Sequence, residues 1–311
     1  MRSNFIISAP RSGSTWLSNM IDHHPEITAV ERRLFGNYAD FVTSSKSKDS
    51  RLRITLDKFV SSISNHYDVG LCEKKSLLCE FIKTILMFES KNSNSENIID
   101  KITPYPGTVN VVCEGIEKYF KDCKIILLIR DGRDVVTSGT FNWIDKCKDF
   151  KIKCSFESQR EKSLAFGTYQ SLDKFFLKEE VIEWSNLWVE VLNSFKLLEE
   201  NHSVILIKYE ELSSDCYSVL KKCFDFLNLS TCENIINRCI ENCNFDKMSG
   251  GRSRGEMKIN SHVRKGVCGD WVNYFSQDDA YLFNRIAGKH LLAYDYEESS
   301  SWPLEYNFKY Q

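Results

Sequence analysis

The fold is decided near the start of the chain by the stretch Phe5-Ile6-Ile7-Ser8-Ala9-Pro10-Arg11-Ser12-Gly13-Ser14-Thr15-Trp16-Leu17. Its first five residues form a short apolar run, typical of a buried strand, which Pro10 and Gly13 then interrupt. The hydroxyl side chains of Ser14 and Thr15 follow, and such residues commonly begin a helix. A strand, a tight turn and a helix in this order direct backbone N–H groups and the helix dipole at one point. The stretch therefore predicts a binding site for a phosphate or sulfate group.

This turn differs from the loop that binds ATP or GTP in many nucleotide-hydrolysing proteins. That loop follows the pattern G-x-x-x-x-G-K-[ST], and neither its first glycine nor its Gly-Lys pair is present here. We therefore do not expect an ordinary ATP or GTP site, and Arg11 stands beside the turn as a candidate cation.

Two further stretches complete a resemblance to a known family. They are Leu127-Leu128-Ile129-Arg130-Asp131-Gly132-Arg133-Asp134-Val135-Val136-Thr137-Ser138 and Arg264-Lys265-Gly266-Val267-Cys268-Gly269-Asp270-Trp271. With the first turn, they resemble the cofactor motifs of sulfotransferases that use 3′-phosphoadenosine-5′-phosphosulfate (PAPS). The three motifs occur in the order and spacing of that family and bracket almost the whole chain.

The resemblance implies binding of PAPS and of its product 3′-phosphoadenosine-5′-phosphate (PAP), with no metal required. It places the 5′-phosphosulfate among Ser12, Gly13, Ser14 and Thr15, and the adenine against Trp16. It places the 3′-phosphate among Arg130, Ser138, Arg264, Lys265 and Gly266. Tyr209, Phe245 and Met248 resemble further adenine contacts, although each is equally explained as a core side chain. For Asp131, Arg133 and Asp134, ion pairs at the start of a helix are the simpler interpretation.

The catalytic base is where the sequence departs from the best-known cytosolic members. Those carry a His in a Lys-Thr-His-x-Pro segment, and Ile102 stands at the corresponding place here. A different subgroup, which includes protein-tyrosine sulfotransferases and many bacterial enzymes, has a Glu after a D-x-HPEI segment and a later Lys before Pro. By that resemblance Glu31 is the base, and Lys101 steadies the sulfuryl group.

Two other side chains complete the predicted catalytic set. Arg11, which also belongs to the predicted cofactor site, is expected to contact the bridging oxygen of the phosphosulfate. His24 is the rival base, because a histidine titrates near neutral pH. The alternative for His24 is a structural role, packed against Pro25 at the end of a helix.

Composition sets limits on the molecule as a whole. The 311 residues carry a net charge of −2, which gives no reason to expect a nucleic-acid partner. No apolar run reaches the roughly 18 residues of a membrane span, and the first strand follows Met1 without a signal-peptide core. We expect one cytoplasmic domain over residues 1–311, and the oligomeric state stays open. The twelve cysteines lack zinc-ligand spacing, so we expect free thiols that pack as small apolar residues.

Short apolar runs alternate with helical patterns along the chain. Strands are predicted at 5–9, 109–113, 124–129 and 204–208, and apolar residues at three- and four-residue steps predict a long helix over 184–198. Polar tracts at 43–50, 89–97 and 249–258 predict exposed loops. Strands and helices in alternation, with anion-binding turns after the strands, favour an α/β fold: one doubly wound parallel sheet flanked by helices.

The predicted function is transfer of the sulfuryl group from PAPS to a small-molecule acceptor, in line and without a metal. The acceptor group is a hydroxyl or an amine, and a role in tailoring a natural product is one possibility that the mixed subgroup character suggests. Two alternatives stay open: a nucleotide-dependent small-molecule kinase, and a non-catalytic PAP-binding protein. The first would need a Gly-Lys-Ser/Thr loop, and the second would have lost the base and Arg11.

Overall fold

The computed structural model describes residues 2–31, 95–104, 106–149, 172–256 and 264–310, with a few single positions between 62 and 88. The elements that carry the site are, in chain order, β1 (Arg2–Ile7), α1 (Ser14–Asp22), β2 (Ile27–Val30), β3 (Asn97–Ile102), α5 (Val109–Tyr119), β4 (Lys124–Ile129), α6 (Gly132–Asp149), α8 (Lys178–Asn201), β5 (Ser203–Lys208), α9 (Tyr209–Ser214), α10 (Cys216–Leu227), α11 (Glu233–Asn242), α12 (Phe245–Ser249), η3 (Asp270–Asn273), α13 (Gln277–Ala293) and η4 (Trp302–Leu304).

The chain divides into two compact units. The first unit consists of Met1–Ala9, Gly13–Ile129 and Asn193–Asn242, and the second of Pro10–Ser12, Arg130–Leu192 and Cys243–Gln311. That residues 1–311 form one domain stays a prediction.

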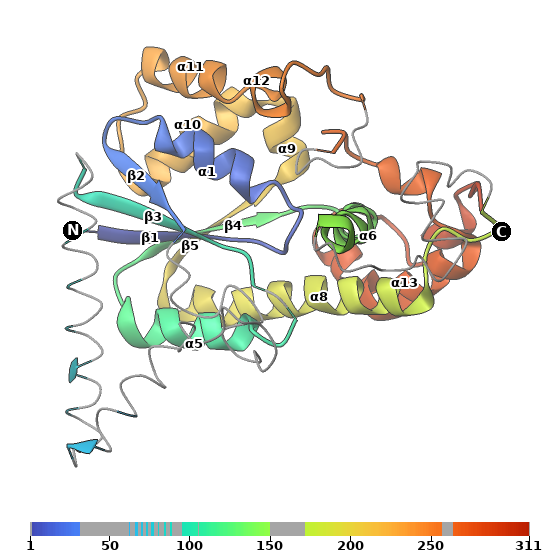
Figure 1. Ribbon diagram of the computed structural model, residues 1–311, viewed down its shortest axis with the longest axis horizontal. Coiled ribbons are helices and arrows are strands. Elements are labelled where there is room, and N and C mark those ends of the chain that lie inside the picture. The colour runs from blue at the N-terminus through green and yellow to red at the C-terminus, as the bar shows by residue number, and fades with distance from the viewer. Residues whose placement is uncertain are drawn as a thin grey trace. The chain divides into compact units, whose positions relative to one another are not determined.

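The first unit is built on a five-stranded sheet in the order β2-β3-β1-β4-β5 (Figure 1). All neighbouring strands run parallel. Helices α1, α10 and α11 lie on one side of the sheet, and α5 and the end of α8 lie on the other (Figure 1). A strand covered on both faces has to be apolar throughout, and β4 is buried at every position after its first. This is the doubly wound α/β arrangement that the sequence predicted.

Parallel strands bring the segments that follow them to one edge of the sheet. Gly13 comes after β1, Glu31 directly follows β2, and Tyr209 directly follows β5. Ligands in sheets of this kind bind outside the carboxyl ends of the strands. The topology therefore gathers three of the predicted site residues at the edge where binding is expected.

The second unit holds the start of α6 firmly in place. The indole Nε1 of Trp188, in α8, donates a hydrogen bond of 2.9 Å to the Arg130 carbonyl. Gly132 and Gly139 allow this close packing, because a Cβ on Gly139 would lie 2.3 Å from the Trp184 ring, and one on Gly132 would lie 2.7 Å from the Trp188 ring. Residues at the beginning of α6 are thus fixed in position relative to α8.

Several predicted elements are confirmed and one is wrong. The strand at 124–129 coincides with β4, the strand at 204–208 lies within β5, and the helix at 184–198 lies within α8. The predicted strand at 109–113 is instead the start of α5. Its buried residues Val109, Val112, Cys113 and Ile116 follow the helical three- and four-residue spacing, which five residues are too few to reveal.

The sheet also differs from the prediction in its remaining strands. Strand β1 begins earlier than expected, since Arg2, Ser3 and Asn4 pair with β3, and it ends at Ile7. Strands β2 and β3 were not predicted, because β2 is short and the charged pair Asp100 and Lys101 interrupts β3. The predicted loop at 43–50 lies outside the described residues, and of the loop at 89–97 only the last three residues are described. The third loop is described as far as residue 256.

The described cysteines are free thiols. Burial raises the pKa of Cys123 and of Cys223 to about 12, so both stay protonated at neutral pH.

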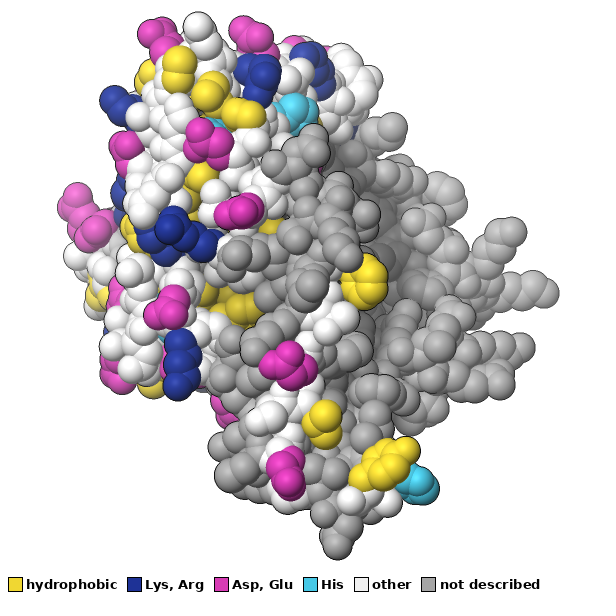
Figure 2. Space-filling view, turned by 90° about the vertical axis from the view of Figure 1, so that its left-hand side faces the viewer, with side chains coloured by type: hydrophobic (Ala, Val, Ile, Leu, Met, Phe, Trp, Pro, Cys, Tyr) yellow, Lys and Arg dark blue, Asp and Glu magenta, His cyan; other side chains and the backbone are white. Residues whose placement is uncertain are grey.

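Figure 2 shows charged side chains of both signs interspersed over the described part of one face, as the nearly balanced charge of the sequence leads one to expect. None of the described helices combines the length and the apolar character that crossing a membrane requires.

Candidate functional site

Gly13 shapes the turn at the start of α1. It is the N-cap of the helix with a φ of 89°, in the left-handed region where glycine is at least cost. A Cβ on Gly13 would lie 2.5 Å from Cδ2 of Tyr209, so glycine is required by space as well as by conformation. The ring of Tyr209 also lies 6.1 Å from that of Trp16, measured between centroids. Three predicted cofactor residues therefore lie together in the first unit.

Lys101 connects two other parts of the first unit. Its Nζ lies 3.3 Å from Oε2 of Glu31 and 3.4 Å from the hydroxyl of Thr15. Glu31 follows β2, Lys101 lies near the end of β3, and these strands are paired with Val30 opposite Asp100. Adjacent strand ends thus bring the predicted base, the predicted sulfuryl-stabilising lysine and a predicted phosphosulfate ligand into contact.

His24, the rival base, is buried and packed against Phe224. It is 2% exposed, and its ring lies 4.5 Å from the ring of Phe224. The backbone N–H of Glu26 donates to Nδ1 at 3.1 Å, so the proton lies on Nε2, which donates to the Ser230 carbonyl at 2.9 Å. Both ring nitrogens are thus engaged by the backbone, which favours the packed role at the end of a helix.

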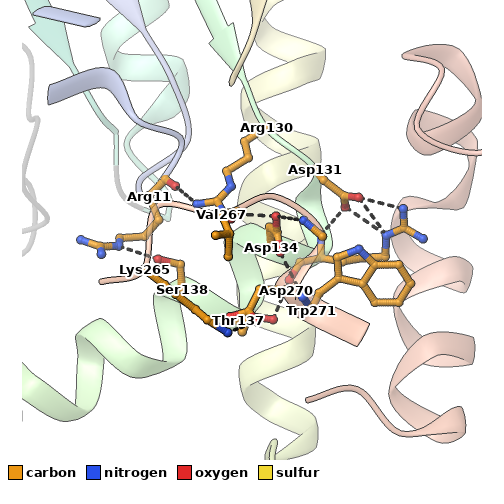
Figure 3. Close-up of polar contacts among 12 residues, drawn as sticks. Arg11, Arg130, Asp131, Asp134, Thr137, Ser138, Lys265, Val267, Asp270 and Trp271 are labelled. Atoms are coloured by element: carbon orange, nitrogen blue, oxygen red, sulfur yellow. Dashed lines mark hydrogen bonds and ion pairs between the residues drawn. The ribbon is translucent and has the colours of Figure 1, made fainter. Parts of the chain in front are cut away.

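Arg11 belongs to a second group of predicted residues in the second unit, and the other members of this group are Arg130, Ser138 and Lys265 (Figure 3). Its Nε donates to the hydroxyl of Ser138 at 3.1 Å, and its Nη1 donates to Oδ1 of Asn142 at 3.3 Å. Its φ of 72° is strained for a residue other than glycine, and such strain is concentrated at functional sites. Nη1 of Arg130 donates to the Arg11 carbonyl at 3.2 Å and helps to hold this conformation.

The segment 264–271 presents its two basic residues differently. Arg264 has a side chain only 6% exposed, which stacks 4.7 Å from the centroid of the Phe141 ring and pairs with Asp270 at 2.7 Å. The side chain of Lys265 is 25% exposed, and its Nζ lies 2.6 Å from the other oxygen of Asp270. Gly266 follows with a φ of 68°. Of the two cations, Lys265 is therefore the one that a ligand can reach.

Asp270 is held as a carboxylate by these neighbours. Burial by itself would raise the pKa of Asp270, but the hydrogen bonds and positive charges of Lys265 and Arg264 outweigh it. The pKa of Asp270 is accordingly lowered from its ordinary value.

The charged residues at the start of α6 divide into two pairs. Arg133 is buried, donates to both oxygens of Asp131 and also pairs with Glu297. Its guanidinium lies 3.9 Å from the centroid of the Trp271 ring. These contacts agree with the ion-pair interpretation of the sequence. Asp134 instead pairs with Arg130 at 3.1 Å and accepts two hydrogen bonds from the segment 264–271.

Two residues of this group were missed as site residues by sequence reasoning. Asn142 lies four residues after Ser138 on α6, and Asp134 lies four residues after Arg130, so a four-residue spacing was the available signal. The remaining adenine candidates, Phe245 and Met248, lie on α12 in the second unit. Met248 is half-buried, and the side chain of Phe245 lies outside the described part.

The chemistry of the second group suits an oxyanion. Guanidinium groups present forks of N–H donors that match phosphate, and a neighbouring ammonium and hydroxyl add further donors. Arg11, Arg130, Ser138 and Lys265 supply these groups from three segments of the second unit.

Comparison with known proteins gives this geometry a family. A family model described as the sulfotransferase domain matches residues 2–295. The chain belongs to the sulfotransferase family. Cytosolic sulfotransferase 3 of Arabidopsis thaliana is 22% identical to this chain over 217 residues, which are 65% of either chain. Sulfotransferase 1E1 of Rattus norvegicus is 22% identical over 295 residues, which are 92% of this chain and 82% of the rat protein.

The extent of these matches varies. This chain spans 65% of the Arabidopsis relative and 55% of sulfotransferase 2A1 of Rattus norvegicus. Among solved structures, mouse sulfotransferase SULT7A1 complexed with PAP matches with a TM-score of 0.53 at 17% identity, covering 98% of this chain and 89% of the mouse chain. That match shows a shared fold and confirms the fold class predicted from sequence.

Proposed function

We propose that this sulfotransferase transfers the sulfuryl group of PAPS to a hydroxyl or amine of a small molecule. The observation that carries the proposal is the contact of Lys101 with both Glu31 and Thr15. The sequence resemblance had assigned these residues to one reaction, although Thr15 and Lys101 are 86 positions apart in the chain. Their convergence supports a reaction site here.

The turn between β1 and α1 fits the phosphosulfate of PAPS. The side chain of Ser12 is buried, so the contribution proposed for Ser12 is its backbone N–H group. Gly13 gives α1 an N-terminus without a side-chain cap, and α1 offers the positive end of its dipole there. Ser14 and Thr15 would complete this part of the cofactor site.

The remaining cofactor contacts are assigned from the second group and from the aromatic residues. Arg130, Ser138 and Lys265 would hold the 3′-phosphate, with Gly266 beside them. Arg264 would act by shaping the segment, because its side chain is buried against Phe141. Trp16 and Tyr209, with Phe245 and Met248, are the proposed adenine contacts.

The proposed reaction uses these residues to position reactants and to stabilise charge. PAPS supplies a sulfuryl group on a good leaving group. As the bond from sulfur to the bridging oxygen breaks and the bond to the acceptor forms, Glu31 takes the proton of the acceptor. Lys101 and Arg11 offset the negative charge on the transferring group and on the bridging oxygen. Neither contribution requires a metal ion.

The acceptor is proposed only as a class. A phenol, an alcohol, an amine or a sugar fits this chemistry, and tailoring of a natural product is one such role. We propose that aromatic residues within 35–97 and 141–180 line the acceptor site, and most of these positions lie outside the described residues. A screen of acceptors with labelled PAPS identifies the class directly. We place the reaction in the cytoplasm.

The two alternatives differ from this proposal in the nucleotide that they bind or use. A small-molecule kinase needs a donor nucleotide with Mg²⁺, whereas a non-catalytic PAP-binding protein binds PAP but forms no product. The family match and the pairing of Lys101 with Glu31 favour sulfuryl transfer over both.

Thermal unfolding of the whole chain with different nucleotides distinguishes a kinase from both a sulfotransferase and a non-catalytic PAP-binding protein. We expect PAP to raise the melting temperature in the presence of EDTA, since a ligand at 100 times its Kd stabilises the folded state by about 2.7 kcal/mol. ATP and GTP at the same concentration should raise it less. A larger shift with ATP or GTP, appearing only with Mg²⁺, would instead support the kinase.

A further inference from the structure

We propose that Asp134 is a positioning residue for the 3′-phosphate. Its carboxylate holds Arg130 and the segment 264–271 in one arrangement, so that Arg130 and Lys265 contact the same phosphate. The inference rests on the proposed function, because it concerns how PAP is bound. It adds Asp134 to the residues that serve the proposed function, as one that does not itself contact the nucleotide.

The contacts of Asp134 come from two parts of the second unit (Figure 3). The residue is 1% exposed. Its Oδ2 accepts from Nη2 of Arg130 at 3.1 Å and from the backbone N–H of Gly269 at 2.8 Å. Its Oδ1 accepts from the backbone N–H of Trp271 at 3.1 Å. One buried carboxylate thus joins the start of α6 to a segment about 135 positions later in the chain.

Arg130 makes the same connection from its own side. Its Nη2 also donates to the carbonyl of Val267 at 2.9 Å. The guanidinium is therefore oriented both by Asp134 and by the segment that Asp134 holds. Loss of the carboxylate would remove the acceptor of the Gly269 and Trp271 backbone N–H groups and of Nη2 of Arg130. Buried hydrogen bonds to a charged group are among the stronger ones.

A short path leads from Asp134 to Lys265. The two amides held by Asp134 belong to Gly269 and Trp271, the residues on either side of Asp270. Asp270 in turn fixes Nζ of Lys265 at 2.6 Å. The position of the lysine that a ligand can reach therefore depends on the backbone that Asp134 fixes, while the exposed part of Lys265 stays available for the phosphate.

The test compares two nucleotides that differ only in the 3′-phosphate, PAP and adenosine 5′-monophosphate (5′-AMP). The variant is Asp134→Asn, which keeps the size of the side chain but sets an amide NH₂ against N–H donors. Asp131→Asn is the matched control, because it removes the same charge from a nearby buried carboxylate that pairs with Arg133. It therefore corrects for the gain in PAP affinity that losing any negative charge near the phosphate would give.

Both dissociation constants are measured by titration calorimetry on the whole chain. We expect Asp134→Asn to reduce the preference for PAP over 5′-AMP by about tenfold or more, the scale of a lost charged hydrogen bond, with the 5′-AMP constant unchanged within about threefold. Asp131→Asn should keep the wild-type preference for PAP or increase it. An unchanged preference in Asp134→Asn, or an equal loss for both nucleotides, would overturn the positioning role. A wild-type protein without any preference for PAP would instead contradict the proposed function.

Hydrogen exchange on the wild-type protein gives a second test that does not depend on the folding of a variant. PAP should slow exchange in the peptides that contain Asp134 and Gly269 by a similar factor, because the carboxylate couples them, and 5′-AMP should slow neither. Protection by PAP of only one of these peptides would overturn the proposal.

Discussion

Gly13 makes the sharpest prediction for a single residue. Gly13→Ala should lower the free energy of unfolding through two terms: about 1–2 kcal/mol for a left-handed alanine and about 1–3 kcal/mol for crowding against Tyr209. Gly107→Ala is the matched control, because Gly107 also has a positive φ, of 75°, but a Cβ there would meet nothing described within 4 Å. Urea unfolding of both variants measures the difference. Equal losses would mean that Tyr209 does not lie against the turn.

The sequence allowed some residue roles to be predicted and hid others. Glu31 and Lys101 could be named because each stands in a recognisable segment, and the structure brings them into contact. The ion pair of Arg133 with Asp131 could be expected because the two are neighbours in the chain. The role of Asp134 could not, since its backbone partners Gly269 and Trp271 are 135 and 137 positions away. The only partner of Asp134 that the sequence pattern indicates is Arg130, which lies four residues before it.

At the scale of elements, regular apolar runs were predictable and interrupted ones were not. β4 has five consecutive apolar residues after Lys124, whereas β3 carries Asp100 and Lys101 within its pairing to β1 and β2. That interruption is also what places Lys101 at the site. The feature that concealed the strand is therefore the feature for which we propose a function, as expected where local pattern and global fold disagree.

The segment leading into η3 predicts a dependence of stability on pH. Because the pKa of Asp270 is lowered in the folded state, its contribution is present above the unfolded value of about 3.9 and is lost as the pH falls through the folded pKa. Asp270→Asn should therefore lower stability at neutral pH and flatten the loss of stability below about pH 4. Unfolding by urea from pH 7 to pH 3 measures both. The same acid slope in the variant and in the wild type would contradict the role of Lys265 and Arg264 in holding this carboxylate.

For the whole molecule, the prediction of one domain is tested by whether the chain unfolds in a single cooperative transition. Trp16 belongs to the first unit, and the other five tryptophans belong to the second. Fluorescence therefore reports mainly on the second unit, and far-ultraviolet circular dichroism reports on both. We expect the two signals to follow one transition in urea, as a single cooperative domain does. Two separated transitions would show that the units unfold independently.

The central claim is that Glu31 serves sulfuryl transfer from PAPS, and the formation of PAP with labelled PAPS tests it most directly. We expect the wild-type protein, given a panel of phenols, alcohols, amines and sugars, to form PAP and a labelled product in equal amounts without a metal. Glu31→Gln should lower this turnover by about 10²-fold or more while PAP affinity stays nearly intact. His24→Asn, with its buried ring replaced, should lower stability and keep turnover well above that of Glu31→Gln. PAP binding without product from any acceptor, or full turnover in Glu31→Gln beside an inactive but folded His24→Asn, would contradict the claim.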